Sequence, residues 1–325
     1  MLSTIEKTAN LPPLSPSASL IAIPTSLEAQ VGNTPLLQLR RVAEIAGLPE
    51  QVQLYAKAEW FNPSGSVKDR PALNIIRTAE WQGLLKPGMT LMDSTSGNMG
   101  IAYAMLGAAR GYRIKLTLPE NASPERIAIL RSYGAELIFT DPLEGSDGAI
   151  TEVRRLAAES GQDVYYANQY NNPANWQAHY YTTANEIWQQ TGRQVTHFIA
   201  GLGTSGTFVG TTRRLKELNP HIRCISFQPD SPFNGLEGLK YMETAIKPGI
   251  YDPYAADDDL PLKTEEAYGM ARILARQEGL FVGISSAAAV AASVQVARQQ
   301  KEAVVVTILP DNGFKYLSER FWNEH

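Results

Sequence analysis

The sequence predicts an α/β protein of two domains, each built on a parallel-type sheet flanked by helices. Short apolar segments alternate with amphipathic ones along the chain, and repeated β–α alternation is typical of parallel sheets covered by helices on both faces. At 325 residues the chain is long enough for two domains of common size. Its 44% hydrophobic residues and formal net charge of −4 are typical of a globular protein.

The elements are predicted from short apolar runs bounded by turn residues and from helical spacing. Strands are expected at Val52–Ala58, Thr90–Asp93, Ile114–Leu118, Glu136–Thr140, Val195–Ala200, Ile222–Phe227 and Ala303–Leu309. Helices are expected after Lys68, at Gly100–Arg110, Pro124–Tyr133 and Ala288–Arg298, and around Arg213, Arg214 and Lys216. Residues 168–188 are expected to cross between the two halves. Residues 1–27, rich in Pro, Ser, Ala and Thr, are expected to form a flexible tail.

Composition excludes several classes of function. The pI of about 5.7 gives no basic field for nucleic acid. No apolar run approaches the roughly 18 residues of a membrane helix, and no secretory signal is recognisable. The single cysteine, Cys224, rules out a disulfide within the chain and fits a reducing compartment, so we expect a cytoplasmic location. The four histidines lack metal-ligand spacing, and no metal site is expected.

Lys68 is the most informative residue, because it follows a turn-prone segment and directly precedes an amphipathic helix. The surrounding sequence, residues 62–70, is NPSGSVKDR. The positive end of a helix dipole disfavours a nearby ammonium, so it should lower the lysine pKa and favour the neutral amine. A neutral amine can attack an aldehyde, as in the imine that pyridoxal 5′-phosphate (PLP) forms with a lysine. The alternative is an ordinary solvated surface lysine.

Three further turns carry glycine together with hydroxyl or amide side chains. Residues 94–100 (STSGNMG) open a helix after a strand and could bind a carboxylate or phosphate through backbone N–H groups. Residues 201–207 (GLGTSGT) formally contain the dinucleotide fingerprint GxGxxG, but their hydroxyls suit a phosphate monoester better. Residues 283–287 (GISSA) place Ser285 either as a helix cap or as a hydrogen-bond partner of a ring nitrogen.

Together these segments resemble the cysteine synthase branch of the fold-type II PLP enzymes, whose fold is like that of the tryptophan synthase β subunit. The resemblance runs from the GNTPL sequence at residues 32–36 to PDNG at 310–313, followed by YLS at 316–318. Between them lie NPSGSVKDR, TSGN, QYNNPAN at 169–175, GTSGT and GISS, in the order typical of that family. The resemblance implies a homodimer with PLP as its cofactor.

Site residues follow from this resemblance, position by position. Lys68 matches the catalytic lysine that forms the imine with PLP, Asn98 the asparagine that bonds the PLP 3′-oxygen, and Ser285 the serine facing the pyridine nitrogen. The positions that match the phosphate cup are Gly203, Thr204, Ser205, Gly206 and Thr207. The positions that match the binding site of the substrate α-carboxylate are Thr95, Ser96, Met99 and Gln169.

The implied domains are a smaller, mobile, substrate-closing unit at 63–171 and a larger unit at 28–62 and 172–325 that binds the PLP phosphate. The implied reaction is β-replacement on an O-activated L-serine, O-acetylserine or O-phosphoserine, with sulfide or another sulfur donor to give L-cysteine. Met99 stands where threonine is usual, so one hydroxyl bond to the substrate, about 1 kcal/mol, is absent. Because of this difference, the identity of the nucleophile is not determined by the resemblance.

The leaving group is the second open point. In relatives that use O-phosphoserine, an arginine stands at the position of Lys240. A cation there would stabilise a departing phosphate through bonds of roughly 1.5–3 kcal/mol, whereas the alternative is a solvated lysine. We hypothesise that O-phosphoserine is accepted alongside O-acetylserine.

Two other functions stay open from sequence. One is β-replacement with a nitrogen or thiol nucleophile, as in a diaminopropionate-precursor synthase or a cystathionine-type synthase, or deamination by a lyase of this fold. The other, from a different class, is a non-catalytic relative, or a nicotinamide-dependent dehydrogenase if GLGTSG binds a dinucleotide. A visible absorption band bleached by borohydride would separate PLP from NAD.

Overall fold

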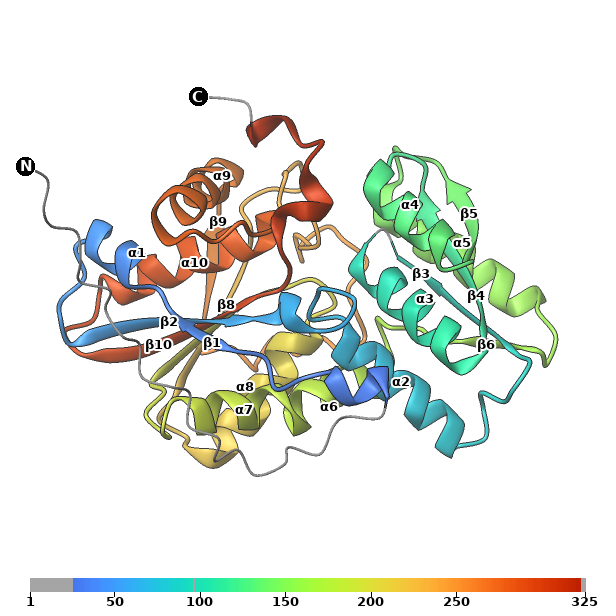
Figure 1. The fold of residues 1–325 in the computed structure, drawn as a ribbon, viewed down its shortest axis with the longest axis horizontal. Coiled ribbons are helices and arrows are strands. Elements are labelled where there is room, and N and C mark those ends of the chain that lie inside the picture. Colours follow the sequence, from blue (N-terminus) through green and yellow to red (C-terminus); the bar gives the residue numbers. More distant parts are fainter. Residues whose placement is uncertain (1–25, 96, 323–325) are drawn as a thin grey trace, which may run out of the picture.

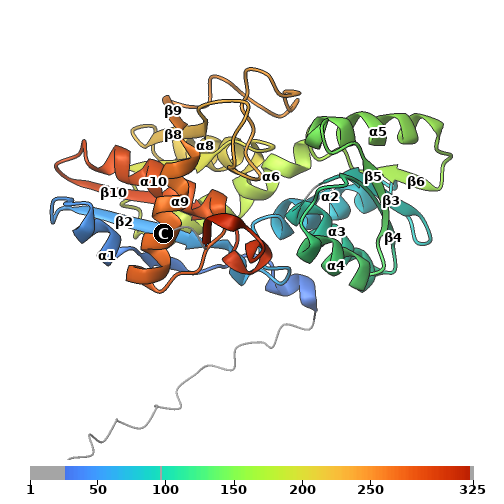
Figure 2. The same ribbon diagram turned by 90° about the horizontal axis from the view of Figure 1, so that it is seen from above.

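A computed structural model describes residues 26–95 and 97–322. The predicted tail at 1–27 therefore falls almost wholly outside the described residues, and so does Ser96. The chain forms two lobes, each with its own sheet, and the lobes lie side by side in both views (Figures 1 and 2). Among the helices that the structure describes, none has the length and apolarity needed to span a bilayer.

The larger sheet has six strands in the order β1-β2-β10-β7-β8-β9. Their bounds are Leu36–Gln38, Val52–Ala58, Ala303–Leu309, His197–Gly201, Arg223–Pro229 and Asp258–Leu262. All neighbouring pairs are parallel except β1 with β2, which is antiparallel. The expectation of a parallel sheet is thus right for its interior and wrong for the β1 edge, where the segment between β1 and β2, which contains α1 (Arg40–Ile45), brings β2 back alongside β1 in the opposite direction.

Helices cover both faces of this sheet, and the strand pleat explains why. In β10, Val305 and Leu309 pack into one hydrophobic cluster with α1, α9 and α10, while Val306 and Ile308 pack into a second cluster with α7 and α8. Alternate residues of a strand point to opposite faces, so an uninterrupted apolar strand must be buried on both. The helices are α1 (Arg40–Ile45), α7 (Thr183–Gln190), α8 (Gly206–Leu218), α9 (Thr264–Ile273) and α10 (Ile284–Ala297).

The smaller sheet has four parallel strands in the order β5-β4-β3-β6. Their bounds are Glu136–Thr140, Arg113–Pro119, Thr90–Ser94 and Val164–Tyr166. Figure 2 shows α5 on one side of this sheet and α3 and α4 on the other. Leu116 accordingly packs in the cluster with α3, whereas the hydroxyl of the next residue, Thr117, bonds the Ala149 carbonyl of α5 at 2.8 Å.

The remaining helices connect the lobes or flank them. They are α2 (Asp69–Trp81), α3 (Asn98–Arg110), α4 (Pro124–Ser132), α5 (Gly145–Glu159) and α6 (Pro173–Tyr181). Helix α6 packs against both α2 and α8, so the segment expected to cross between the halves does lie between them. Short helical turns occur at Leu27–Gln30, Glu59–Phe61, Leu274–Glu278, Gly313–Tyr316 and Arg320–Trp322.

All seven predicted strands are present, while β1, β6 and β9 were missed. The first two have only three residues, and β9 contains Pro261 and two aspartates, which is tolerated at a sheet edge. Helix α10 starts at Ile284 rather than Ala288, because Gly283 is its N-cap. Every strand of the smaller sheet lies within 63–171. That is consistent with the proposed domain limits, and the mobility of this unit stays a prediction.

Candidate functional site

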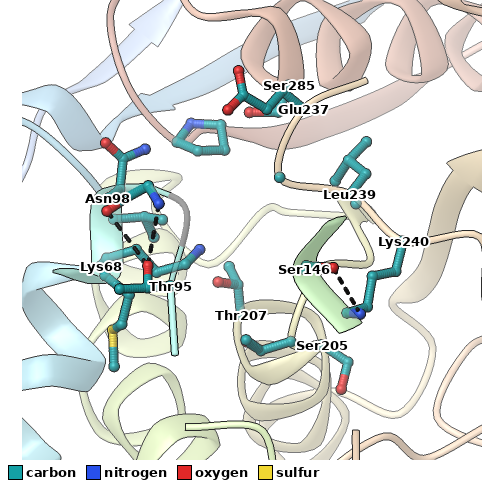
Figure 3. Close-up of a pocket in the computed structure, with 18 of the residues that line it drawn as sticks. Lys68, Thr95, Asn98, Ser146, Ser205, Thr207, Glu237, Leu239, Lys240 and Ser285 are labelled. Atoms are coloured by element: carbon teal, nitrogen blue, oxygen red, sulfur yellow. Dashed lines mark hydrogen bonds between the residues drawn. The ribbon is translucent and has the colours of Figure 1, made fainter. Parts of the chain in front are cut away.

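A cavity of about 490 Å³ lies where loops from the two sheets face each other (Figure 3). The loop after β3 and the loop after β7 both line it, and each loop leads from the carboxyl end of a parallel strand into a helix. Open α/β sheets bind ligands at this edge, because the loops there converge and helix N-termini point inward. The position alone therefore makes this cavity the candidate site.

Eleven of the thirteen residues predicted for the site line the cavity. They are Lys68, Thr95, Asn98, Met99, Gln169, Gly203, Thr204, Ser205, Thr207, Lys240 and Ser285. Ser96 lies outside the described residues. Gly206 is not part of the wall but packs behind it, where an added Cβ would clash with the Asn175 side chain. The fold thus brings together motifs that are up to 217 positions apart in sequence.

Lys68 is half-buried and is the N-cap residue of α2. The surrounding protein lowers the pKa of its amine, mainly by desolvation, and the charge of Asp311 only partly opposes this shift. The direction is the one expected from sequence, but the expected cause, the helix dipole, is not the main one. A lowered pKa favours the neutral amine that reaction with an aldehyde requires.

The loop that carries Lys68 is fixed at both ends. Asp69 accepts hydrogen bonds from the backbone N–H of Ser64 at 2.7 Å and from its hydroxyl. Burial raises the pKa of this Asp69 carboxyl to about 6. On the other side, Val67 donates its N–H to the Pro310 carbonyl at 2.8 Å, so the loop is attached to the end of β10. These contacts hold the Lys68 backbone in one place relative to the cavity.

The loop between β7 and α8 fits a phosphate monoester. Ser205 adopts a left-handed conformation with φ of 68° at the N-cap of α8, and its hydroxyl is buried with no hydrogen-bond partner among the described residues. A side chain at Gly203 would clash with the Gly238 carbonyl. The first N–H groups of a helix have no intrahelical partner and favour anions. An unsatisfied hydroxyl in such a place fits the PLP phosphate that the resemblance implies.

His179 lies directly behind this loop and is fully buried. Its Nε2 lies 3.3 Å from the Thr207 hydroxyl, and its Nδ1 lies 3.0 Å from the Thr183 hydroxyl. Burial and the charges of Arg70 and Lys68 lower the pKa of His179 well below its ordinary value, so the imidazole is neutral. The position of His179 in the sequence carries no signal of the contact with Thr207.

The side of the cavity expected to bind the substrate carboxylate is formed around the start of α3. The Thr95 hydroxyl accepts the N–H groups of Gly97 and Gly100, each at 3.2 Å, so Thr95 orders the loop from within. Gln169 is buried, and its side-chain amide donates to the Ser94 carbonyl at 2.7 Å. Met99 is buried in the first turn of α3. Their contact with a substrate stays a prediction.

The two serines at the start of α10, Ser285 and Ser286, make different contacts. Ser286 donates its hydroxyl to the Asp311 carbonyl at 2.9 Å, which ties α10 to the end of β10. Ser285 points its side chain toward the cavity (Figure 3). Neither serine is the helix cap, so that alternative is wrong: Gly283 occupies the cap, where a side chain would clash with the Asp311 carboxylate.

Two ion pairs at the cavity were not predicted from sequence, and both join the lobes. Arg126 of α4 bonds Glu237 in the loop after β8, and its guanidinium lies 4.7 Å from the centre of the Tyr316 ring. Lys240 bonds Asp147 of α5 at 2.7 Å. Burial raises the pKa of Asp147, but its bonds with Lys240 and the Ile246 N–H outweigh this, so the net pKa is lowered. Pairing across more than 90 residues leaves no sequence pattern.

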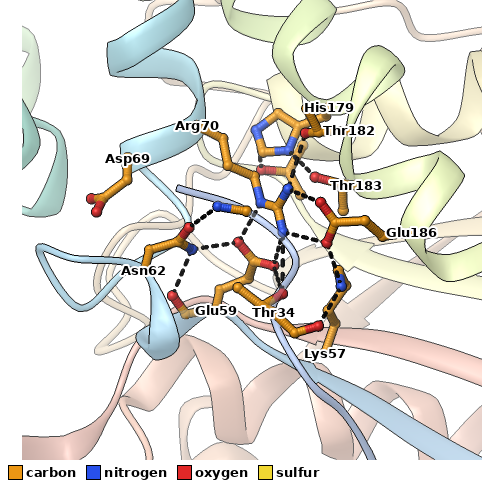
Figure 4. A network of polar contacts seen from close by, with 12 residues as sticks. Thr34, Lys57, Glu59, Asn62, Asp69, Arg70, His179, Thr182, Thr183 and Glu186 are labelled. Atoms are coloured by element: carbon orange, nitrogen blue, oxygen red, sulfur yellow. Dashed lines mark hydrogen bonds and ion pairs between the residues drawn. The ribbon is translucent and has the colours of Figure 1, made fainter. Parts of the chain in front are cut away.

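A buried charged network lies beneath the Lys68 loop (Figure 4). Arg70 forms two bidentate pairs, with Glu59 at 2.7 and 2.9 Å and with Glu186 at 2.6 and 2.8 Å. Lys57 adds a second cation to the network, with its Nζ 2.7 Å from Glu186 Oε2. Two cations and two carboxylates balance, and the network ties α2 to β2 and α7. Within the described ranges, no group of three or more His, Cys, Asp or Glu residues is placed to bind a metal ion.

Comparison with known proteins gives consistent matches. The family model described as "Pyridoxal-phosphate dependent enzyme" matches residues 27–311. A cysteine synthase of Aquifex aeolicus is 50% identical over 90% of this chain and 91% of its own length, and cysteine synthase B of Escherichia coli is 42% identical over 92% and 97%. Among solved structures, cysteine synthase from Entamoeba histolytica superposes with a TM-score of 0.89 at 36% identity, covering 96% of this chain and 94% of that one.

Proposed function

The chain belongs to the family of pyridoxal-phosphate dependent enzymes, and we propose that it is a cysteine synthase that exchanges the acetate of O-acetyl-L-serine for sulfide. The observation that carries this proposal is the placement of the Lys68 amine in one cavity with the β7–α8 loop and its unsatisfied Ser205 hydroxyl. The similarity to cysteine synthases over nine-tenths of the chain supports the choice of reaction.

The residues present can hold the cofactor and run this reaction. When bound, PLP supplies an electron-withdrawing ring that acidifies the α-proton of an attached amino acid and eases loss of its β-substituent. The N–H groups and hydroxyls of residues 203–207 hold its phosphate. Lys68, with its lowered pKa, attaches the cofactor and afterwards accepts the α-proton as a general base. The Ser285 hydroxyl is neutral and leaves the ring nitrogen without a carboxylate partner, which favours elimination over racemisation.

Exclusion of water is the second task of this site. The pairs Arg126–Glu237 and Lys240–Asp147 join the smaller lobe to the loop after β8 in the larger one, at the cavity wall. Once an activated serine has lost its β-substituent, its β-carbon is ready to react with sulfide. Water that enters the cavity at this stage would hydrolyse the substrate before sulfide can add. We propose that these contacts keep the lobes together during that interval, as lids do in other enzymes.

The contact of Lys240 bears on the choice of leaving group. Its ammonium is buried against Asp147 and lies 5.3 Å from the centre of the Tyr170 ring, so its charge is already compensated. A lysine in such a pair has less to offer a departing phosphate dianion than an uncompensated cation. O-acetylserine, whose leaving group carries less charge, is therefore the favoured donor, and the hypothesis that Lys240 binds the phosphate of O-phosphoserine is the alternative that the next experiment tests.

A donor and acceptor panel tests both points. Wild-type enzyme should form L-cysteine from O-acetylserine and sulfide, identified by mass spectrometry, with kcat/KM at least about tenfold above that for O-phosphoserine. Lys240→Ala should change the two kcat/KM values by similar factors. Efficient turnover of O-phosphoserine that is lost selectively in Lys240→Ala would instead establish Lys240 as the phosphate-binding cation. Preferential use of an amine or thiol acceptor over sulfide would reject the proposed reaction.

The homodimer implied by the resemblance belongs to this proposal. Large apolar side chains such as Phe61, Trp81 and Tyr181 are more than half exposed in the single chain, which supports a partner surface. Sedimentation equilibrium should give a mass close to twice the 35.6 kDa of one chain. A mass of one chain at micromolar concentration would contradict the proposal.

A further inference from the structure

The side chain of Asn98 lies between two opposite charges supplied by the segment after β10. Its Nδ2 donates to Asp311 Oδ2 at 2.7 Å, and its Oδ1 accepts from Lys315 Nζ at 2.8 Å. Asp311 is fully buried and Lys315 is 7% exposed, so both charges act without screening by solvent. Asn98 itself lines the cavity, and the two charged residues lie behind it.

This arrangement permits only one orientation of the amide. A 180° flip about the last side-chain bond exchanges an oxygen and a nitrogen of nearly equal size, and it normally costs little. Here a flip would turn the Asn98 oxygen toward the Asp311 carboxylate and its NH₂ group toward the Lys315 ammonium. Both new contacts would be repulsive and would leave two buried charges without partners.

The two charges are themselves held in place. Lys315 also donates to the carbonyls of Ser64 at 3.2 Å and Gly65 at 3.3 Å, so its three N–H bonds all have acceptors. Asp311 Oδ2 also accepts the Tyr316 hydroxyl at 2.8 Å. The clamp, defined as Lys315 together with Asp311, thus connects Asn98 to the loop that carries Lys68.

Of the two hydrogens on Asn98 Nδ2, the bond to Asp311 uses one, and one remains for a ligand in the cavity. Because Lys315 donates to Oδ1, it withdraws electron density from the amide and makes the remaining N–H a stronger donor. When the Asn98 N–H donates to an oxygen atom of the ligand, the hydrogen bond favours the ionised form of that oxygen over its protonated form.

We propose that Lys315 and Asp311 are positioning residues for Asn98: they fix its amide so that the second N–H is committed to the ring oxygen of PLP. The proposal rests on the proposed function insofar as PLP occupies the cavity and Asn98 faces its 3′-oxygen. Neither charged residue lines the cavity, and the proposed positioning acts through Asn98. The charge of Asp311 also acts directly on the Lys68 amine. This task was not predicted from sequence: Asp311 lies in the PDNG segment of the resemblance but had no role assigned to it, and Lys315 lies outside the quoted motifs.

A double-mutant cycle on PLP binding tests this inference. Lys315→Met should weaken the PLP dissociation constant of the reconstituted enzyme about tenfold and lower the fraction of bound PLP whose ring oxygen is ionised, read from its two absorption bands. In the Asn98→Ala background the same substitution should change the dissociation constant less than about twofold. Asp311→Asn should also weaken binding in the wild-type background, but part of its loss should remain in the Asn98→Ala background, because the Asp311 charge also acts on Lys68.

Lys216→Met is the matched control, because Lys216 is also paired with a carboxylate, Asp257 at 2.6 Å, but lies on α8 with no contact to Asn98. It should leave PLP affinity and absorption unchanged. An equal loss of affinity from Lys315→Met with and without Asn98, or no loss in either background, would overturn the inference. If Lys315→Met does not fold, Lys315→Gln, which keeps an amide donor, should show a loss of about threefold that again disappears with Asn98→Ala.

The two proposals fail in distinguishable ways. If the wild-type enzyme binds PLP but makes no cysteine, the proposed reaction is wrong. The double-mutant cycle can still be interpreted in that case, because it measures cofactor binding and not turnover. A wild-type enzyme that makes cysteine while the cycle shows additive losses would reject only the positioning role.

Discussion

Lys68→Ala should purify without covalently attached PLP and should lose cysteine formation by roughly 10³-fold or more, because the same amine attaches the cofactor and accepts the α-proton. The visible absorption band that borohydride bleaches in the wild type should be absent. Turnover of O-acetylserine with sulfide and the absorption spectrum, measured at the same PLP concentration, check the two expectations separately.

Lys240→Ala is the matched control for this experiment, since it removes the other lysine amine that lines the cavity. That variant should keep the covalent cofactor and its absorption band, because Lys240 is engaged with Asp147. A Lys68→Ala enzyme that keeps the borohydride-sensitive band, or turns over at near wild-type rate, would show that another residue is the attachment point.

Arg70→Met should lower the free energy of unfolding by about 3–5 kcal/mol at neutral pH, since it removes one partner from a buried ionic network. The guanidinium donates to both oxygens of Glu59 and of Glu186, and its side chain is 1% exposed. Without it, two buried carboxylates face a single remaining cation, Lys57. Urea unfolding of wild type and variant at saturating PLP measures the difference.

The pH dependence of this loss follows from Glu186. Burial raises its pKa, but the hydrogen bonds and charges of Arg70 and Lys57 outweigh this and bring the pKa down to about 2. A carboxyl whose pKa is lower in the folded state stabilises the fold above its unfolded pKa of about 4.5, and this contribution fades as pH falls toward 2. The gap between wild type and Arg70→Met should therefore narrow as pH falls from about 4.5 to 3.

Arg41→Met supplies a surface comparison. Arg41 pairs with Glu44 at 2.6 Å, but both side chains are more than half exposed. Its loss should cost less than about 1 kcal/mol, because water competes for both charges. If Arg70→Met were no more destabilising than Arg41→Met, the network would contribute little to the fold, and the buried charges would need another explanation.

Local patterns in the sequence were sufficient for seven of the ten described strands and for the loops of the site. Val52–Ala58 and Ala303–Leu309 were predicted with their observed limits. The second is an almost continuous apolar run, as expected for a strand covered on both faces, whereas the first alternates apolar residues with Gln53, Tyr55 and Lys57. The glycine and hydroxyl loops at 94–100 and 201–207 were equally readable. A left-handed turn or a close backbone approach must be encoded by the residues that adopt it. Gly203 is an example, because its backbone lies so close to the Gly238 carbonyl that any side chain would clash.

Only the tertiary structure decided which charges are paired. Arg126 pairs with Glu237, Lys240 with Asp147, and Asp311 and Lys315 both bond Asn98, across 93 to 217 positions, and each of these charged residues alone is compatible with a solvated surface. The same holds for the main cause of the lowered pKa of Lys68, which is desolvation within the folded protein. The physical reason is that backbone conformation depends on near neighbours in sequence, whereas desolvation and ion pairing depend on which segments the two sheets bring to their common edge.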